Sequence, residues 1–276
     1  MTETIRTIAF IGATSGLGRT AADQLARDGH RLVLVGRDPK RVQRLAEQVP
    51  GAVVIGADVA TSAGIDHAVT RIESAVDHLD ALVNNAGVMI PTRRTTDEGI
   101  ELNLAVHHLA PYSMTGRLLP LLRAGAGRVV NVNSEGHRAP LFGGGHVGID
   151  LDDLNMEHGY EPFLAYSRTK LANLLFTYEL QRRHPELSVV AVHPGMVRTD
   201  LGRHWPRLQV AAMHAMSISA RKGAKPVLSL ATAPRVEHGA YYNRFTTTRS
   251  SAESYDPHLA HQVWTATETL RGPFGG

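Results

Sequence analysis

Cysteine is absent from the 276-residue sequence. Its absence excludes disulfide bonds and thiolate metal sites, and it fits a chain that folds in a reducing compartment. Long apolar runs are absent as well, because no stretch reaches the roughly 18 uninterrupted apolar residues that a membrane-spanning helix needs. The first six residues, MTETIR, contain no apolar signal core. We therefore expect a cytoplasmic protein with no transmembrane segment.

Charge of one sign is also scarce. The 29 Lys and Arg residues nearly balance the 26 Asp and Glu residues, and no run of five like charges is present. The chain thus lacks the basic arm that is typical of nucleic-acid binding, and no nucleic-acid partner is expected. The 15 histidines are scattered, and the closest grouping, His258 with His261, lacks a third ligand at a useful spacing. No metal site is expected.

Short apolar runs recur along the chain, at residues 8–11, 31–35, 53–55, 81–83, 129–132 and 189–192. Segments of helical length, such as 17–27, 39–48 and 63–76, lie between them. Strands that are buried on both faces appear as unbroken Val, Ile and Leu runs, and their alternation with helices indicates parallel crossover units. The pattern predicts an α/β fold in one domain, a doubly wound parallel sheet with helices on both faces.

A glycine-rich turn, GATSGLG at residues 12–18, stands directly between the first apolar run and the first helical segment. A dinucleotide pyrophosphate needs backbone N–H donors at a helix N-terminus, and glycine lets the backbone approach closely. The plainer alternative is a βα loop that carries glycines without a ligand. About twenty residues further on, Gly36 ends the second run where an acidic residue would bind the ribose hydroxyls of NAD, and Arg37 follows it. Arg37 therefore favours NADP(H) over NAD(H), although a solvated surface arginine is the alternative.

Tyr166 and Lys170 are spaced i, i+4 in a helical stretch, so both side chains share one helix face. Free tyrosine has a pKa of about 10, and a nearby ammonium group lowers that pKa toward the working range of an acid/base catalyst. Ser134 ends a central apolar run, where its hydroxyl could donate to a substrate carbonyl oxygen. Each of these features also occurs by chance in proteins without such a site.

Taken in order, these residues resemble the short-chain dehydrogenase/reductase family in its single-domain form. The matching positions are Gly12, Gly16 and Gly18, then Asp58, then residues 84–87 (NNAG), then Ser134, Tyr166 and Lys170, and finally Pro194 with Gly195. Within the family, residues 164–175 (LAYSRTKLANLL) and 192–204 (VHPGMVRTDLGRH) are similar to the retinol dehydrogenase-like branch. The resemblance implies one Rossmann-type, NADP-binding domain over residues 1–276.

The family implies a role for each matching position. Tyr166 would be the proton donor in reduction, Lys170 would bind the nicotinamide ribose, and Ser134 would orient the carbonyl. The cofactor would contact Gly12, Thr14, Ser15, Gly16, Leu17, Gly18, Arg37, Asp58, Val59, Asn85, Ala86, Gly87, Tyr166, Lys170, Pro194, Gly195, Val197 and Thr199.

The sequence departs from the family at two positions. Ile11 stands where the family usually has Thr before the first glycine, a change of little expected consequence. His107 stands where the family has the Asn that holds a water in the proton relay behind the lysine. Histidine can also hold water, so His107 is a fourth candidate catalytic residue. It could equally be a buried histidine whose hydrogen bonds are satisfied within the protein.

The segment after Gly195, about residues 196–220, is expected to form a lid over an apolar small-molecule substrate, or else an ordinary amphipathic helix on the core. The resulting hypothesis is an NADP(H)-dependent oxidoreductase that acts on a carbonyl/alcohol pair. The alternatives are C=C reduction at the same site and a non-catalytic protein that senses NADP(H). The resemblance leaves open whether the protein is a monomer or a homo-oligomer.

Overall fold

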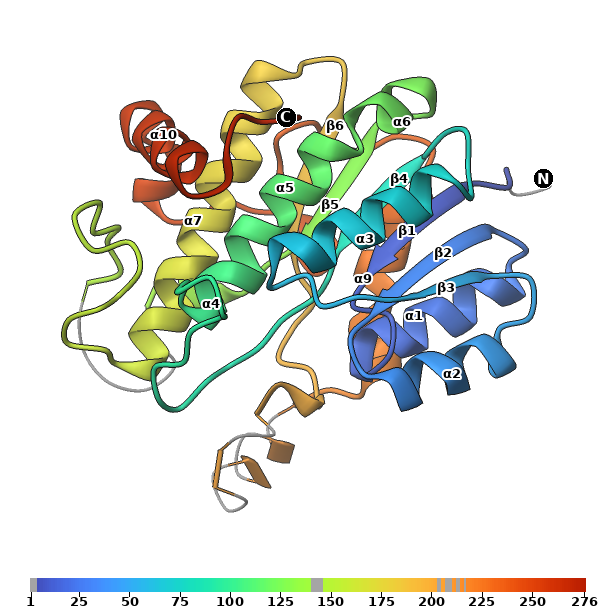
Figure 1. Ribbon diagram of the computed structural model, residues 1–276, viewed down its shortest axis with the longest axis horizontal. Coiled ribbons are helices and arrows are strands. Elements are labelled where there is room, and N and C mark those ends of the chain that lie inside the picture. The colour runs from blue at the N-terminus through green and yellow to red at the C-terminus, as the bar shows by residue number, and fades with distance from the viewer. Residues whose placement is uncertain (1–3, 140–145, 203–204, 207–209, 212–213, 216) are drawn as a thin grey trace.

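A computed structural model describes residues 4–139, 146–202, 205–206, 210–211, 214–215 and 217–276 (Figure 1). Eight strands in this part of the chain form one sheet in the order β3-β2-β1-β4-β5-β6-β7-β8, and only β8 is antiparallel to its neighbour. The strands are β1 (Thr7–Ile11), β2 (Arg31–Gly36), β3 (Val53–Gly56), β4 (Ala81–Asn84), β5 (Arg128–Val132), β6 (Ser188–His193), β7 (Tyr241–Asn243) and β8 (Thr246–Thr247). The predicted doubly wound α/β fold is confirmed.

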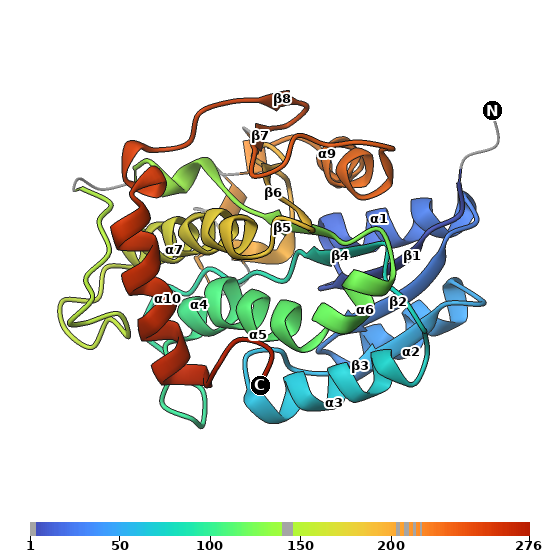
Figure 2. The same ribbon diagram turned by 90° about the horizontal axis from the view of Figure 1, so that it is seen from above.

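Helices cover both faces of the sheet (Figure 2). One face packs against α1 (Gly16–Arg27), α2 (Pro39–Gln48) and α9 (Ala220–Thr232). The other face packs against α3 (Ser62–Glu73), α5 (Ala110–Arg117), α7 (Pro162–Arg183) and α10 (Pro257–Arg271). The central strands are buried on both sides, as their unbroken apolar runs predict. Among the described residues, no helix combines the length and apolarity needed to cross a membrane.

Two local features are not visible in the apolar pattern. The last two strands of the sheet, β7 and β8, have three and two residues and are too short to produce an apolar run. A π-helical turn, η1 (Ala105–Leu109), lies between α4 (Leu102–Leu104) and α5, and His107 is at its centre. Such turns insert an extra residue into a helix and are frequent at functional sites. Here the turn aims the ring of His107 toward α7.

Candidate active site

A cleft of about 840 Å³ opens at the carboxyl ends of the parallel strands, and it includes the point where the strand order reverses between β1 and β4. Ligands bind at this point in doubly wound sheets. Every site residue predicted from the sequence lines this cleft. Residues that the sequence did not single out line it as well, among them Asn133, Arg41 and Asp200.

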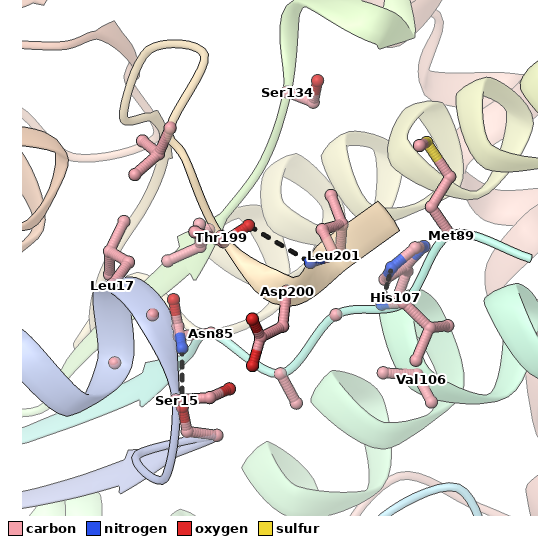
Figure 3. Close-up of a pocket in the computed structure, with 18 of the residues that line it drawn as sticks. Ser15, Leu17, Asn85, Met89, Val106, His107, Ser134, Thr199, Asp200 and Leu201 are labelled. Carbon is pink, nitrogen blue, oxygen red and sulfur yellow. Dashed lines mark hydrogen bonds between the residues drawn. The ribbon is translucent and has the colours of Figure 1, made fainter. Parts of the chain in front are cut away.

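The cleft has two ends with different chemistry. The arginine end is defined by Arg37, Arg41, Asp58 and Asp200, and the tyrosine end by His107, Ser134, Tyr166 and Lys170. Figure 3 shows Thr199 and Asp200, which follow β6, between Ser15 and Leu17 of the glycine turn on one side and His107 on the other.

The glycine turn joins β1 to α1 with its backbone packed closely on itself. A Cβ atom at Gly18 would lie 2.0 Å from the Gly12 carbonyl oxygen, and the Asn85 side-chain amide donates to that oxygen over 2.9 Å. The N-cap residue Ser15 makes no side-chain capping hydrogen bond, whereas α2, α3, α7, α9 and α10 each begin at a side chain that does. The first turn of α1 therefore presents its N–H groups to the cleft without a side-chain cap, an arrangement that suits a pyrophosphate.

At the arginine end, a steric contact explains why glycine is present at the last position of β2. A Cβ atom at Gly36 would lie 2.0 Å from the Thr14 methyl carbon, so no side chain, acidic or otherwise, fits there without a rearrangement. Arg37 follows, with its Nη1 atom 3.7 Å from Asp58 Oδ2, and both side chains are about half exposed. Asp58 also accepts a hydrogen bond of 3.1 Å from the Ala60 N–H. A cationic group thus stands at the strand end in place of a carboxylate.

Tyr166 is buried at the tyrosine end, in the first turns of α7. Burial raises the pKa of its phenol, and a hydrogen bond with the Ser134 side chain opposes that rise. Ser134 is itself held in place: its Oγ accepts from the Gly136 N–H over 3.1 Å, and its carbonyl oxygen accepts from His137 Nδ1 over 2.6 Å. The His137 Nε2 atom accepts from the Ser251 N–H over 3.2 Å, so this ring is neutral.

Lys170 lies one helical turn beyond Tyr166, as the spacing predicts, and its ammonium group is 5.7 Å from the centre of the Tyr166 ring. Its Nζ donates a hydrogen bond of 3.0 Å to the Val132 carbonyl oxygen. Burial lowers the pKa of Lys170 to about 7. The expected fall in the Tyr166 pKa is not found in this structure, because the burial that weakens the ammonium charge also disfavours the phenolate.

Both ring nitrogens of His107 are occupied by hydrogen bonds within the protein. Its Nε2 accepts from the Val88 N–H over 3.1 Å. The Thr169 hydroxyl donates to the Tyr166 carbonyl oxygen, so its oxygen accepts from His107 Nδ1 over 2.9 Å. Burial, reinforced by the charge of Lys170, holds the pKa of His107 well below its usual value. The ring is therefore neutral, and it stands edge-on to the Tyr166 ring with centroids 5.2 Å apart. This geometry corresponds to the buried, satisfied histidine of the two alternatives.

Two asparagines that sequence reasoning missed connect these groups. Asn133 donates to the Lys170 carbonyl oxygen over 3.0 Å and to Asn173 Oδ1 over 2.9 Å. Asn173 in turn donates to the His107 carbonyl oxygen over 2.9 Å. The signal in the sequence was weak but present, since Asn173 lies seven residues after Tyr166, on the same helix face, and Asn133 directly precedes Ser134. The network ties α7 to β5 and to the π-helical turn.

The predicted lid, residues 196–220, is described except for residues 203–204, 207–209, 212–213 and 216. Its two ends meet at a β-bridge between Val197 and Ile218. Trp205 Nε1 donates to the Met89 carbonyl oxygen over 3.1 Å, and the Trp205 ring packs on that of Phe163 with centroids 4.6 Å apart. The described parts of the segment thus contact both the loop after β4 and the start of α7.

Comparison with known proteins agrees with this geometry. The model of the short chain dehydrogenase family matches residues 6–146. A protein of Streptomyces sp. (strain C5), provisionally named a daunorubicin C-13 ketoreductase, is 36% identical over 97% of this chain and 93% of its own length. Human retinol dehydrogenase 14 is 32% identical over 97% of this chain and 86% of its own.

Among solved structures, an uncharacterized protein from Mycobacterium paratuberculosis is 31% identical and superposes with a TM-score of 0.78 over 98% of this chain and 95% of its own. The similarity to these relatives extends over nearly the whole chain. The protein therefore belongs to the short chain dehydrogenase family of oxidoreductases, in its retinol dehydrogenase-like branch.

Proposed function

We propose that this protein interconverts a lipophilic carbonyl compound and its alcohol with NADP(H), and that Tyr166 is the catalytic acid/base. The observation that carries the proposal is the convergence of Ser134 with the buried Tyr166 and Lys170 at one end of a cleft that also includes the glycine turn and Arg37. Family membership supports a nicotinamide cofactor. The intact trio speaks against a protein that only senses the cofactor.

The proton chemistry follows from burial. Because burial raises the pKa of Tyr166, the phenol is protonated at neutral pH, and this is the form that gives a proton to the carbonyl oxygen in reduction. Ser134 hydrogen-bonds the phenol and can donate to the same oxygen as negative charge develops on it. When bound, the nicotinamide ring supplies or accepts the hydride at the carbon atom. Lys170, whose ammonium group is 5.7 Å from the centre of the Tyr166 ring, also lines the cleft and would bind the nicotinamide ribose.

The preference for NADP(H) rests on Gly36 and Arg37. An acidic side chain at the end of β2 would repel a 2′-phosphate. The close contact of Gly36 with Thr14 leaves no room for such a side chain at this position. The Arg37 guanidinium is half exposed at the cleft and carries the charge that a phosphate requires. The residues present therefore fit NADP(H).

The proposed lid and its surroundings suit an apolar substrate. The apolar side chains of Met89, Val106, Leu201 and Val210 line the cleft. The names of two relatives, a retinol dehydrogenase and a daunorubicin ketoreductase, support a substrate of this kind. The cytoplasmic location stays a prediction, and the choice between a monomer and a homo-oligomer stays open.

We propose to test this function with the purified protein, NADPH and a panel of lipophilic ketones and aldehydes, with the products identified by mass spectrometry. NADPH oxidation with formation of the matching alcohol is the expected result. A Ser134→Ala variant should lower kcat by about 100-fold, because it loses one donor to the developing oxyanion. A saturated C–C product with the carbonyl intact would instead indicate C=C reduction, and no turnover with any compound would contradict the proposal.

We infer in addition that His107 positions Tyr166 rather than relaying protons. Its two ring hydrogen bonds join the loop after β4, through Val88, to α7, through Thr169. Neither nitrogen is left to hold a relay water while these bonds are made. The ring edge packs on Tyr166, so the π-helical turn keeps the phenol in place.

A further inference from the structure

An ion pair crosses the cleft at the arginine end. Arg41, on α2, donates from Nη1 to Asp200 Oδ2 over 2.8 Å, and Asp200 begins η3 (Asp200–Gly202) at the start of the lid segment. The neighbouring Thr199 lies against the glycine turn, since a Cβ atom at Gly16 would be 3.0 Å from its methyl carbon. The lid segment therefore touches both α2 and the glycine turn at this end.

Each cation at the arginine end has a carboxylate partner. Arg37 is paired with Asp58 at 3.7 Å, and Arg41 is paired with Asp200 at 2.8 Å. The third carboxylate that lines this end, Asp38, accepts a hydrogen bond from the Arg41 backbone N–H as the N-cap of α2. The two arginines are thus balanced by their two partners, and neither guanidinium is an uncompensated charge.

Both members of the Arg41–Asp200 pair are exposed to solvent, at 34% and 51%. Exposed ion pairs contribute little net stability, because water competes for both partners. A phosphate monoester carries close to two negative charges and three acceptor oxygens, and arginine binds it more strongly than it binds one carboxylate. An arginine in such a pair can therefore change partner when a phosphate group arrives.

We propose that Arg41 is a second ligand of the NADP(H) 2′-phosphate, next to Arg37, and that Asp200 is its internal competitor. When the 2′-phosphate enters the arginine end, Arg41 leaves Asp200 and pairs with the phosphate. NADH brings no phosphate to this position, so the Arg41–Asp200 pair stays intact when NADH binds. Asp200 thereby lowers the affinity for NADP(H). It also lowers the ratio of the NADP(H) affinity to the NAD(H) affinity. This inference rests on the proposed NADP(H)-dependent function.

The test is the dissociation constant for NADPH and for NADH, measured by the fluorescence of the bound cofactor without substrate. We expect Arg41→Ala to weaken NADPH binding about tenfold and to leave NADH binding within about twofold. We expect Asp200→Asn to tighten NADPH binding several-fold, again with little change for NADH. In the double variant, the effect of Asp200→Asn should disappear, because its competitor role requires Arg41. Arg44→Ala, an exposed arginine on the same helix and outside the cleft, is the matched control.

Two outcomes would overturn the inference. NADPH binding that is unchanged in Arg41→Ala would exclude Arg41 as a phosphate ligand. Weaker binding of both cofactors in Asp200→Asn would show that the pair retains the cofactor instead of competing with it. If the unaltered protein bound NADH as tightly as NADPH, the proposed cofactor preference would fail as well. If the unaltered protein preferred NADPH to NADH and Arg41→Ala left NADPH binding unchanged, only this inference would be contradicted.

Discussion

The two ends of the cleft differ in how they hold charge. At the arginine end, Arg37 and Asp58 are 46% and 41% exposed, and their ion pair is loose. At the tyrosine end, Tyr166 and Lys170 are buried. Burial raises the pKa of Tyr166 and lowers the pKa of Lys170, so it favours the uncharged form of both side chains. Exposed charges can exchange partners at small cost, whereas buried groups depend on fixed, fully used hydrogen bonds.

This difference indicates a division of labour. The arginine end can select a cofactor by the charge that it presents, and a substitution there should change affinity by modest factors. The tyrosine end should tolerate few substitutions. Asn133 donates to Lys170 and Asn173, Asn173 donates to His107, and His107 donates to Thr169. The loss of one of these side chains should therefore disturb its neighbours. If chemistry and cofactor choice are separable in this way, substitutions at the two ends should change different kinetic and binding constants.

The largest effect is expected from Lys170→Met. We predict that kcat/KM falls about 1000-fold, because the variant removes the ammonium next to Tyr166. In the unaltered protein the pKa of Lys170 is about 7, so its charge is present below that pH and is lost above it. Kinetics across pH 6 to 9 should therefore show kcat/KM falling as pH rises through about 7.

The Lys170→Met variant should lack this limb of the pH profile. Lys225→Met, at an exposed lysine on α9, should keep both the rate and the limb. A pH limb that persists in Lys170→Met would assign it to another group and contradict the role given to Lys170.

A smaller effect is expected from His107→Ala. The variant leaves a cavity and removes both ring hydrogen bonds, so we predict a loss of about 2–4 kcal/mol in unfolding free energy. We also predict that kcat falls about tenfold while the NADPH dissociation constant stays the same, because only the positioning of Tyr166 is disturbed. Denaturant unfolding and steady-state kinetics measure the two quantities.

His107→Gln distinguishes positioning from a proton relay. A glutamine amide can both donate to Thr169 and accept from the Val88 N–H, and it should recover part of the stability and of kcat together. An alanine variant that keeps its stability but loses turnover would support the relay and overturn the positioning role.

The smallest effect is expected from Arg37→Ala. We predict NADPH binding weaker by about tenfold, or about 1.4 kcal/mol, with NADH binding unchanged. With saturating NADPH, kcat should equal that of the unaltered protein, because Arg37 lies at the far end of the cleft from Tyr166. Isothermal titration with both cofactors checks the affinities. A large loss of kcat at saturation would mean that the two ends are coupled.

The sequence predicts the features that depend on neighbouring residues. The unbroken apolar runs predict the central strands, and the i, i+4 spacing places Tyr166 and Lys170 on one helix face. The order of motifs predicts which strand ends meet at the cleft, and all of the predicted site residues do line it.

Features that depend on tertiary contacts could not be predicted. Arg41 and Asp200 are 159 residues apart in the sequence, and neither belongs to a motif from which contact with the other could be predicted. The hydrogen bonds of His107 depend on a π-helical turn, which has no apolar period of its own. The pKa of Lys170 is lowered by burial, and the spacing of apolar residues in a helix does not predict how deeply one side chain is buried.

The central claim is that Tyr166 performs the chemistry and takes little part in holding the cofactor. The most direct measurement is the single-turnover rate of NADPH oxidation by Tyr166→Phe, saturated with NADPH and mixed with a lipophilic ketone that the unaltered protein reduces. The account predicts a rate at least about 100-fold below that of the unaltered protein, with the NADPH dissociation constant changed by less than about twofold. An unchanged rate in the phenylalanine variant would contradict it.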